Sequence, residues 1–406
     1  MPQRVVVTGL GVVSAAGTEL DPFWQHLMAG QSFIRPLAGF SCAGMEGLVG
    51  SEVALPPEDA LPPWVDRDAT RARCAHLALA AARRALGDAA LPADGAWRER
   101  AGCVFGSTMA EERQASALDD RFAAEGLDAV DPGFLERADP FRLTGAVARA
   151  HGLGGPALMT TTACSSGNAA LALGYDLVAS GAADLVVAGG ADTFTRAVFT
   201  GFLRLGALSK SFCRPFDKRR DGVTFGEGAG ALVLEGLEHA RRRGARLRAE
   251  VAGYGMSNDA HHITAPEPNG DGFARAMRQA LATTGLAPER VDWVSAHGTG
   301  TQYNDLGETR AMKAVFGERA RDVPISSIKS MLGHTNGAAS AIEAVACALA
   351  LERQAVPPTA NLEVPDPECD LDYVPGQGRA RHVGACLNLS AGFGGFNVCL
   401  VLGRAP

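Results

Sequence analysis

The hydrophobic positions of the chain fall into short strand-like runs and longer helical patterns. Residues 4 to 13, RVVVTGLGVV, are apolar and rich in β-branched side chains, which predicts a buried strand ending in glycines. Residues 67 to 86 repeat apolar positions at helical spacing and contain strong helix formers. Residues 101 to 107 predict another strand, whereas residues 111 to 140 are polar and show no clear period. Strands alternating with helices are typical of an α/β protein.

The same pattern starts again at residue 248. RAEVAGYGMS resembles RVVVTGLGVVS, and GFARAMRQALATTGL resembles the helical pattern of residues 67 to 86. Later, PISSIKSMLGHTNGAASAIEAVACALAL resembles ALMTTTACSSGNAALALGYDLVAS. A repeat of this length indicates duplicated domains and not a solenoid. We therefore predict two halves, residues 1–247 and 248–406, each of the form β-α-β…β-α-β.

The segment 159–190 contains the candidate reactive residue of the first half, Cys164. A β-branched run leads into Cys164, small residues follow, and an alanine- and leucine-rich stretch completes a predicted strand, sharp turn and helix. A cysteine at the first turn of a helix faces unpaired N–H groups and the positive end of the dipole, which favour a reactive thiolate. A buried structural cysteine is the alternative. Cys164 and His334 occupy nearly matching places in the two halves, which favours the functional role.

Composition and charge narrow the class of protein. A net charge of −7 gives no electrostatic basis for binding nucleic acid or an anionic membrane. No apolar run reaches the ~18 residues that a membrane span needs. The nine cysteines form no CxxC pair, and the N-terminus predicts a strand and not a signal peptide. We therefore expect a cytoplasmic protein that binds neither nucleic acid nor membrane.

Two histidines lie in glycine-framed turns that follow predicted strands. His297 lies in SAHGTGT, and His334 ends the run KSMLGH. Neutral imidazoles can donate a hydrogen bond to a carbonyl oxygen that becomes negative, and a cysteine can attack and hold an acyl group. This combination points to acyl transfer with thioesters. A zinc site made of Cys164, His297 and His334 is the competing hypothesis, although the sequence offers no fourth ligand.

Ordered motifs along nearly the whole chain resemble one family. They are VVVTGLGVVSAAG, TACSSG around Cys164, RPFDKRRDGVTFGEGAGALVLE, AHGTGT, KSMLGH, and GFGG around Phe393. Together they resemble the elongating β-ketoacyl-acyl-carrier-protein synthases of type II fatty-acid synthesis and their relatives in type II polyketide pathways. The resemblance implies the thiolase fold, an α/β fold in which two duplicated βαβ-type halves pack as an α-β-α-β-α sandwich.

The implied reaction is a decarboxylative Claisen condensation. An acyl chain held on Cys164 would be joined to malonyl-ACP, where ACP is an acyl carrier protein, to give β-ketoacyl-ACP and CO2. The family uses no cofactor for this step and no catalytic metal, and its members are homodimers. The initiating class carries an asparagine in place of the second histidine, so His334 favours the elongating class.

The resemblance also assigns roles to further residues. Lys329 and Glu308 match supporting positions, although Glu308 alone could be a helix-surface carboxylate. Phe393 would act as a gate, and its N–H would join that of Cys164 in an oxyanion hole. Thr299 and Thr301 would contact the pantetheine arm. Phe202 and Met109 would line the pocket for the acyl chain.

Several features leave alternatives open. Ala391 and Phe396 stand where housekeeping fatty-acid enzymes usually carry Phe and Thr, so a specialised polyketide or polyene pathway is an alternative to bulk fatty-acid elongation. A subunit active only with a non-catalytic partner resembling a chain-length factor is a second alternative. A thiolase is a third, although that class needs a cysteine where Phe393 stands. Two further assignments follow from the resemblance. Glu343 would belong to a monovalent-cation site, and Arg67 and Arg71 would form a basic contact to the carrier protein.

Overall fold

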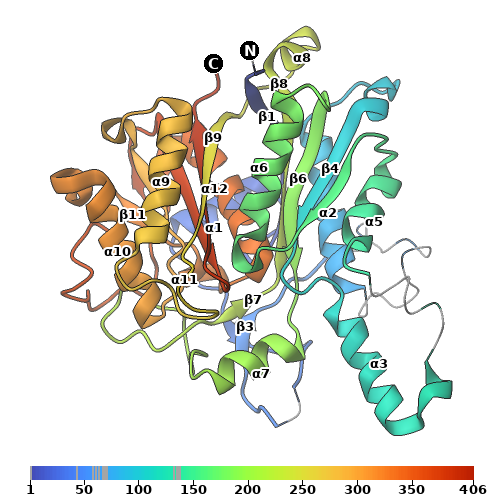
Figure 1. Cartoon of the computed structure of the whole chain (residues 1–406), viewed down its shortest axis with the longest axis vertical. Coiled ribbons are helices and arrows are strands. Elements are labelled where there is room, and N and C mark those ends of the chain that lie inside the picture. The colour runs from blue at the N-terminus through green and yellow to red at the C-terminus, as the bar shows by residue number, and fades with distance from the viewer. Residues whose placement is uncertain are drawn as a thin grey trace.

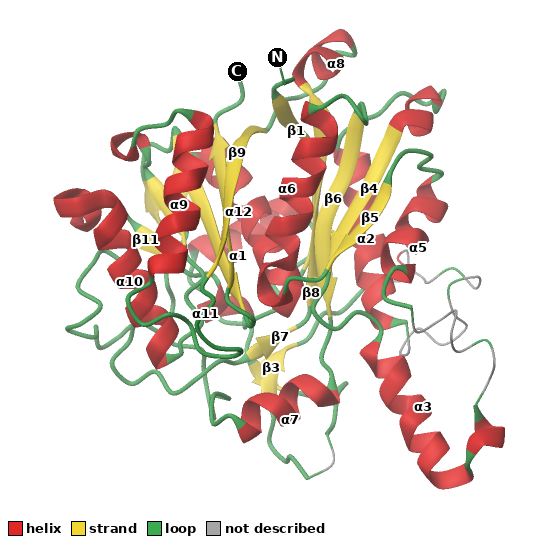
Figure 2. Cartoon of the chain, in the orientation of Figure 1, coloured by secondary structure: helices red, strands yellow, loops and turns green. Residues whose placement is uncertain are grey.

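The computed structural model describes residues 2–42, 44–56, 59, 62, 65, 72–130, 133 and 139–406. The expected carrier contacts Arg67 and Arg71 lie outside these residues. Ten strands form one hydrogen-bonded sheet (Figures 1 and 2). Those of the first half are β1 (Val5–Val13), β4 (Ala101–Gly106), β5 (Ala157–Thr160), β6 (Leu185–Asp192) and β8 (Gly228–Gly236). Those of the second half are β9 (Ala249–Asn258), β10 (Trp293–Ser295), β11 (Ile325–Ser326), β14 (Ala385–Gly392) and β15 (Phe396–Gly403).

The two halves of this sheet have the same topology. Its order is β11-β10-β14-β15-β9-β1-β8-β6-β4-β5, so each half reads first, fifth, fourth, second and third strand from the centre outwards. In both halves the last strand runs antiparallel to its two neighbours, and the outer strands run parallel. The halves join where β1 pairs with β9 over three residues, Val5–Val7. The duplication expected from the sequence is therefore present in the sheet, while the division at residue 247 stays a prediction.

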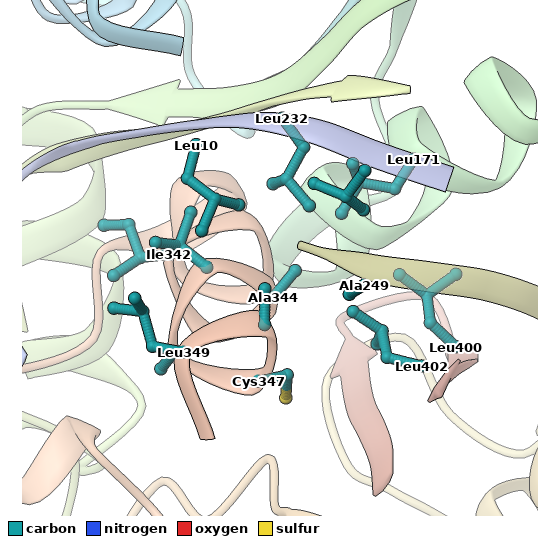
Figure 3. Packing of buried hydrophobic residues seen from close by; sticks show 14 of the residues in the cluster. Leu10, Leu171, Leu232, Ala249, Ile342, Ala344, Cys347, Leu349, Leu400 and Leu402 are labelled. Carbon is teal, nitrogen blue, oxygen red and sulfur yellow. The ribbon is translucent and has the colours of Figure 1, made fainter. Parts of the chain in front are cut away.

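Helices complete a five-layer sandwich, as expected for the thiolase fold. The inner helices α6 (Ser166–Ala179) and α12 (Ala339–Arg353) contact each other and strands of both halves (Figure 1). Helices α2 (Arg73–Asp88) and α5 (Arg142–His151) pack on the outside of the first half, and α9 (Asp271–Thr284) packs on the outside of the second with α10 (Gln302–Phe316) against it. Three apolar clusters fill the spaces between the layers. The central cluster includes Ile342 and Leu349 of α12 together with Leu10, Leu232 and Leu171 (Figure 3).

Smaller elements lie around this frame. The remaining helices are α1 (Leu20–Met28), α3 (Glu112–Glu125), α7 (Arg196–Arg204), α8 (Leu237–Arg242) and α11 (Lys329–Leu332). Short strands are β2 (Arg35–Pro36), β3 (Val49–Ser51), β7 (Phe225–Gly226), β12 (Ala355–Val356) and β13 (Arg379–Ala380). Helix α3 was not expected, because Gln114 is its only buried residue and an exposed helix shows no apolar stripe. Among the described residues, no helix is long and apolar enough to cross a membrane.

The Gly-Leu-Gly run of the first strand serves helix packing. A Cβ on Gly9 or Gly11 would lie 2.1 or 2.0 Å from backbone oxygens of α2, so only glycine lets the helix approach this closely. The second half repeats the arrangement, since a Cβ on Gly255 of β9 would lie 2.1 Å from the carbonyl oxygen of Ala276 in α9. The resemblance between the two glycine runs therefore reflects one packing solution used twice.

Candidate active site

Cys164 lies in the turn between β5 and α6, as the sequence predicts. The turn is a short 3-10 helix, Ala163–Ser165, in which Ala163 adopts a left-handed φ of 51°. The second half builds the same turn at Asn336–Ala338, where Asn336 has a φ of 50° and α12 begins at Ala339. Aligning the two left-handed residues places Gly337 opposite Cys164. His334 therefore precedes the matching position by three residues.

The resting state of the thiol differs from the sequence expectation. Cys164 is 8% exposed, and burial raises its pKa to about 12, although Lys329 acts in the opposite direction. Burial therefore outweighs the position at the helix N-terminus, and the neutral thiol is the resting form near neutral pH. The sulfur can act as a nucleophile only after a base has accepted the thiol proton.

This pKa predicts a distinctive pH dependence for alkylation of Cys164. Only the thiolate attacks iodoacetamide, so the rate should rise about tenfold per pH unit between about pH 6 and pH 9. Intact mass, with the Cys164→Ser variant as the control, measures this rate directly. A rate that levels off below about pH 8 would mean that the helix terminus lowers the thiol pKa more than burial raises it.

His297 and His334 lie close together in the core of the site. Their ring centroids are 5.5 Å apart with an interplanar angle of 84°, and the side chains are 5% and 2% exposed. Burial, with a further contribution from Lys329, holds both imidazole pKa values well below the usual range. Both rings are therefore neutral at physiological pH. Nδ1 of His297 and both ring nitrogens of His334 have no hydrogen-bond partner among the described residues, so the protein itself does not use these buried nitrogens.

Lys329 and Glu308 support the histidine loop from within the core. Lys329 Nζ donates to the His297 carbonyl oxygen at 2.7 Å and to Glu343 Oε1 at 2.5 Å. The backbone N–H groups of His297 and Gly298 donate to the two carboxylate oxygens of Glu308 at 2.6 and 2.8 Å. Glu308 is 1% exposed, so the alternative of a helix-surface carboxylate is wrong. Glu343 pairs with Lys329, and burial raises its pKa to about 7.

Removal of the Glu308 carboxylate should loosen the histidine loop. In the Glu308→Ala variant two buried N–H groups lose their acceptor, and each such loss costs about 1–3 kcal/mol. We expect the free energy of unfolding to fall by at least about 2 kcal/mol and turnover to fall about tenfold. Denaturant unfolding and a steady-state assay measure these two effects. Glu318→Ala removes an exposed carboxylate from the region after the same helix and should change stability by less than about 0.5 kcal/mol. Equal stability of the two variants would contradict the role assigned to Glu308.

The glycine turn after β14 packs over Cys164. A Cβ on Gly392 would lie 2.7 Å from the Thr162 carbonyl oxygen, so the turn lies directly against the cysteine turn. Its other side is tied to the segment after β9, because the Gly394 N–H donates to the Ile263 carbonyl oxygen and the Asp259 N–H to the Gly395 carbonyl oxygen, both at 2.8 Å. Phe393 thus projects from a turn fixed on both sides.

Two cavities meet at Cys164. One is lined by Cys164, both histidines, Ala391, Phe393 and both threonines, Thr299 and Thr301, whose hydroxyls are 3.0 Å apart. The other has a volume of about 230 Å³ and is lined by residues that include Met109, Phe202 and Phe393. The rings of Phe202 and Phe393 stack with centroids 5.1 Å apart. All the predicted site residues that would touch a substrate therefore line these two cavities.

Other polar residues of the site were not expected from the sequence. Asn168 of α6 donates through Nδ2 to the Asn388 carbonyl oxygen and to Ser390 Oγ, both at 3.0 Å. Asn388 Nδ2 donates in turn to Asn168 Oδ1 at 2.9 Å, and the Asn168 N–H donates to Ser340 Oγ at 2.8 Å. This buried network joins both inner helices to β14 behind the cysteine. The sequence could have indicated these residues, because each is a polar residue within an otherwise apolar strand or helix pattern, as in ACLNLSAG.

The alternatives have no matching geometry. Across the described ranges, no three His, Cys, Asp or Glu side chains are grouped so that they could hold a metal ion, which is the arrangement the zinc hypothesis requires. The thiolase alternative requires a cysteine in the glycine turn. Cys386 and Cys399 lie in the flanking strands β14 and β15, with their side chains in the apolar clusters.

Comparisons with known proteins agree with this geometry. The model of the beta-ketoacyl synthase N-terminal domain matches residues 2–240, and that of the C-terminal domain matches residues 248–363. The chain is 41% identical to a 3-oxoacyl-[acyl-carrier-protein] synthase 2 of Synechocystis, covering 98% of this chain and 97% of the relative. It superimposes on the ishigamide ketosynthase/chain length factor structure with a TM-score of 0.92 and 40% identity, over 100% of both chains. A type II polyketide ketosynthase, in complex with its acyl-carrier protein and bound to the hexaketide, gives a TM-score of 0.92 and 33% identity, again over 100% of both chains.

Proposed function

Since the chain belongs to the beta-ketoacyl synthase family, whose members are acyl-transferring condensing enzymes, we propose that Cys164, His297 and His334 carry out its condensation reaction. The reaction joins an acyl chain to malonyl-ACP in fatty-acid or type II polyketide elongation. The observation that carries the assignment is one cavity lined by a buried cysteine and two neutral histidines, three of whose four ring nitrogens have no hydrogen-bond partner within the described part of the chain. This pairing suits an uncharged thioester substrate.

The first step loads the cysteine. The Cys164 thiol gives its proton to a base, for which a neutral imidazole of the same cavity is suited, and the sulfur attacks the carbonyl carbon of an acyl-ACP thioester. The carrier thiol leaves as the new thioester forms and takes up the proton. The acyl chain then occupies the cavity of about 230 Å³ beside Phe202 and Met109.

The second step generates the carbon nucleophile. Malonyl-ACP loses CO2, and the electron pair of the broken C–C bond forms an enolate whose negative charge develops on the thioester oxygen. Neutral imidazoles of His297 and His334 stabilise this oxygen by donating N–H hydrogen bonds. Thr299 and Thr301 line the same cavity and are placed to contact the pantetheine arm.

The third step forms the new carbon–carbon bond. The enolate carbon attacks the acyl carbonyl on Cys164, and the resulting oxyanion accepts hydrogen bonds from the N–H groups of Cys164 and Phe393. Collapse of this intermediate breaks the C–S bond, and Cys164 regains a proton. The net reaction consumes the acyl-cysteine, malonyl-ACP and one proton, and releases β-ketoacyl-ACP, CO2 and the free thiol.

We also propose that the active unit is a dimer in the cytoplasm. β5 is the last strand of the sheet order, and its Leu158 is 38% exposed, which suits pairing with a second chain. The ishigamide structure pairs a ketosynthase with a chain length factor, so the second chain is either another copy or a chain-length-factor-like subunit. All nine cysteines are free, as suits a reducing compartment. Gel filtration with light scattering tests whether the purified chain dimerises by itself.

A carrier-based assay tests the proposed function. The protein is incubated with malonyl-ACP and a panel of saturated and polyunsaturated acyl-ACPs, and the carrier-bound products are weighed by intact mass. A β-ketoacyl-ACP two carbons longer than the primer supports the proposal. Acylation of Cys164 without elongation would support the alternative that a partner subunit is required, and folded protein that accepts no acyl group would overturn the assignment of Cys164.

A further inference from the structure

Segment 213–222, with the sequence CRPFDKRRDG, lies against the threonine loop of the active site, residues 299–302. The Gly222 N–H donates to the Gly300 carbonyl oxygen at 3.1 Å. The Cys213 thiol donates to the Thr299 carbonyl oxygen, with 3.4 Å between sulfur and oxygen. A Cβ on Gly300 would lie 3.1 Å from the Gly222 carbonyl oxygen, so the two backbones are in close contact. The proposed catalytic steps use no side chain of this segment, although it supports the loop that they use.

Arg220 of this segment holds the threonine loop at two points. Its side chain is 3% exposed, and its Nη2 donates to the Gln302 carbonyl oxygen at the end of the loop at 3.4 Å. Its Nε lies 3.7 Å from Oδ2 of the fully buried Asp305. Asp305 in turn accepts hydrogen bonds from the N–H groups of Phe216 at 2.8 Å and of Gly300 at 3.3 Å. One guanidinium therefore holds the end of the loop and also the carboxylate that binds its middle.

A second carboxylate anchors Arg220 on the side away from the loop. Its Nη1 donates to Asp366 Oδ2 at 2.5 Å and to the Asp217 carbonyl oxygen at 3.0 Å. The other carboxylate oxygen of Asp366 accepts a hydrogen bond from the Glu368 N–H at 3.0 Å, so this anchor is itself fixed. A planar guanidinium can address several acceptors in fixed directions, which the point charge of a lysine cannot do. The chemistry of this position therefore suits arginine.

The threonine loop lies between the active site and the protein surface. A third cavity, with a volume of about 390 Å³, is lined by residues that include Thr301, Gln302 and Tyr303. It shares Thr301 and Phe393 with the cavity that contains Cys164. Tyr303 is 72% exposed, so the third cavity reaches the surface. A carrier-bound thioester that enters by these two cavities passes along the loop that Arg220 holds.

We propose that Arg220 is a positioning residue that holds Thr299 and Thr301 where they bind the pantetheine arm. The proposal rests on the proposed function, in which the arm delivers its thioester to Cys164. Arg220 is not among the residues that line the three cavities, so it acts on the arm through the threonine loop. Loss of Arg220 therefore weakens the use of the arm and leaves the reactivity of the sulfur in place.

Two thioesters that differ only in the arm test this role. Hexanoyl pantetheine carries the arm, whereas ethyl thiohexanoate has an ethyl group in its place. Intact mass follows the rate at which each thioester acylates Cys164 in the full-length protein. We expect hexanoyl pantetheine to react about 30-fold faster, the effect of about two net hydrogen bonds. In the Arg220→Gln variant this ratio should fall to about threefold, while the rate with ethyl thiohexanoate should change by less than about twofold.

A second variant and a matched control accompany this measurement. Asp366→Asn removes the anchor of Arg220 but leaves the arginine in place, and it should lower the same ratio by about threefold. Arg219→Ala is the control, because Arg219 is the neighbour of Arg220 in the motif but its side chain donates to Asp217 and Glu363. This control should leave the ratio unchanged. Melting temperatures establish that each variant folds.

Several results would overturn the inference. A ratio near one in the unsubstituted protein would mean that the threonine loop does not bind the arm. A ratio that both folded variants, Arg220→Gln and Asp366→Asn, leave unchanged would remove Arg220 from the binding of the arm. An equal loss of rate with both thioesters would mean that Arg220 supports the active site as a whole. Acylation of the unsubstituted protein by neither thioester would instead overturn the proposed role of Cys164, so the two failures are distinguishable.

Discussion

Replacing Cys164 by alanine is expected to abolish condensation, with a loss of at least about 10³-fold in turnover. The reaction has no acyl-enzyme without the sulfur, and the neighbouring side chains that line the cavities offer no second thiol. After incubation with acyl-ACP and malonyl-ACP, no β-ketoacyl-ACP should form and the protein mass should remain unchanged, both read in the same sample.

The control for this variant is another buried thiol, outside the lining of both cavities. Cys103→Ala removes such a thiol from β4 and should leave the acyl-enzyme and the condensation product intact. Melting temperatures establish that both variants fold. Condensation by folded Cys164→Ala protein at more than about a tenth of the normal rate would remove Cys164 from the mechanism.

Replacing His297 or His334 by alanine should slow the decarboxylation of malonyl-ACP by about 10²–10³-fold each, the usual effect of losing one oxyanion donor. The two rings act on the same developing charge, so the double variant should lose less than the product of the single effects. Release of CO2 from labelled malonyl-ACP measures this step.

Measuring the acylation of Cys164 in the histidine variants distinguishes loss of an oxyanion donor from general damage to the active site. If the imidazoles act mainly on the enolate, single variants should still form the acyl-enzyme, although more slowly where the ring also accepts the thiol proton. His382→Ala changes an exposed histidine and should leave both reactions unchanged. Normal decarboxylation in either active-site variant would contradict the proposed pair of oxyanion donors.

Local sequence patterns predicted the parts of this protein that depend on local chemistry. The strand, turn and helix around Cys164 follow from a β-branched run, small residues and helix formers in order. The duplicated topology follows from repeated motifs, and both glycine runs are explained by close contact with a helix.

What the sequence could not predict depends on burial, which distant segments create. A helix N-terminus suggested a thiolate at Cys164, but burial raises the thiol pKa instead. Glu308 could not be distinguished from a surface carboxylate until its contacts with the loop of His297 were known. Asp192 is an isolated polar residue in the sequence, and the hydrogen bond that its carboxylate accepts from the Gly337 N–H forms only when β6 and the turn before α12 meet.

The two pseudo-symmetric halves of the fold use the same left-handed turn in two different ways. The left-handed turn of the first half is followed by Cys164, the proposed nucleophile, whereas the matching position in the second half is Gly337. That glycine lets the turn pack against Asp192 and Thr108. In the proposed mechanism, one copy of the motif supplies the reacting sulfur, and the other, through Asn336, lines the cavity that would receive the acyl chain.

A single-turnover transfer experiment tests the central claim most directly. Cys164 is loaded with an isotopically labelled acyl chain, free donor is removed, and malonyl-ACP is added while protein and carrier masses are followed over time. The account predicts that the label leaves Cys164 at the rate at which it appears on the carrier, in a β-ketoacyl chain two carbons longer. Label that remains on Cys164 while malonyl-ACP is decarboxylated, or that is released only as free acid, would contradict the account.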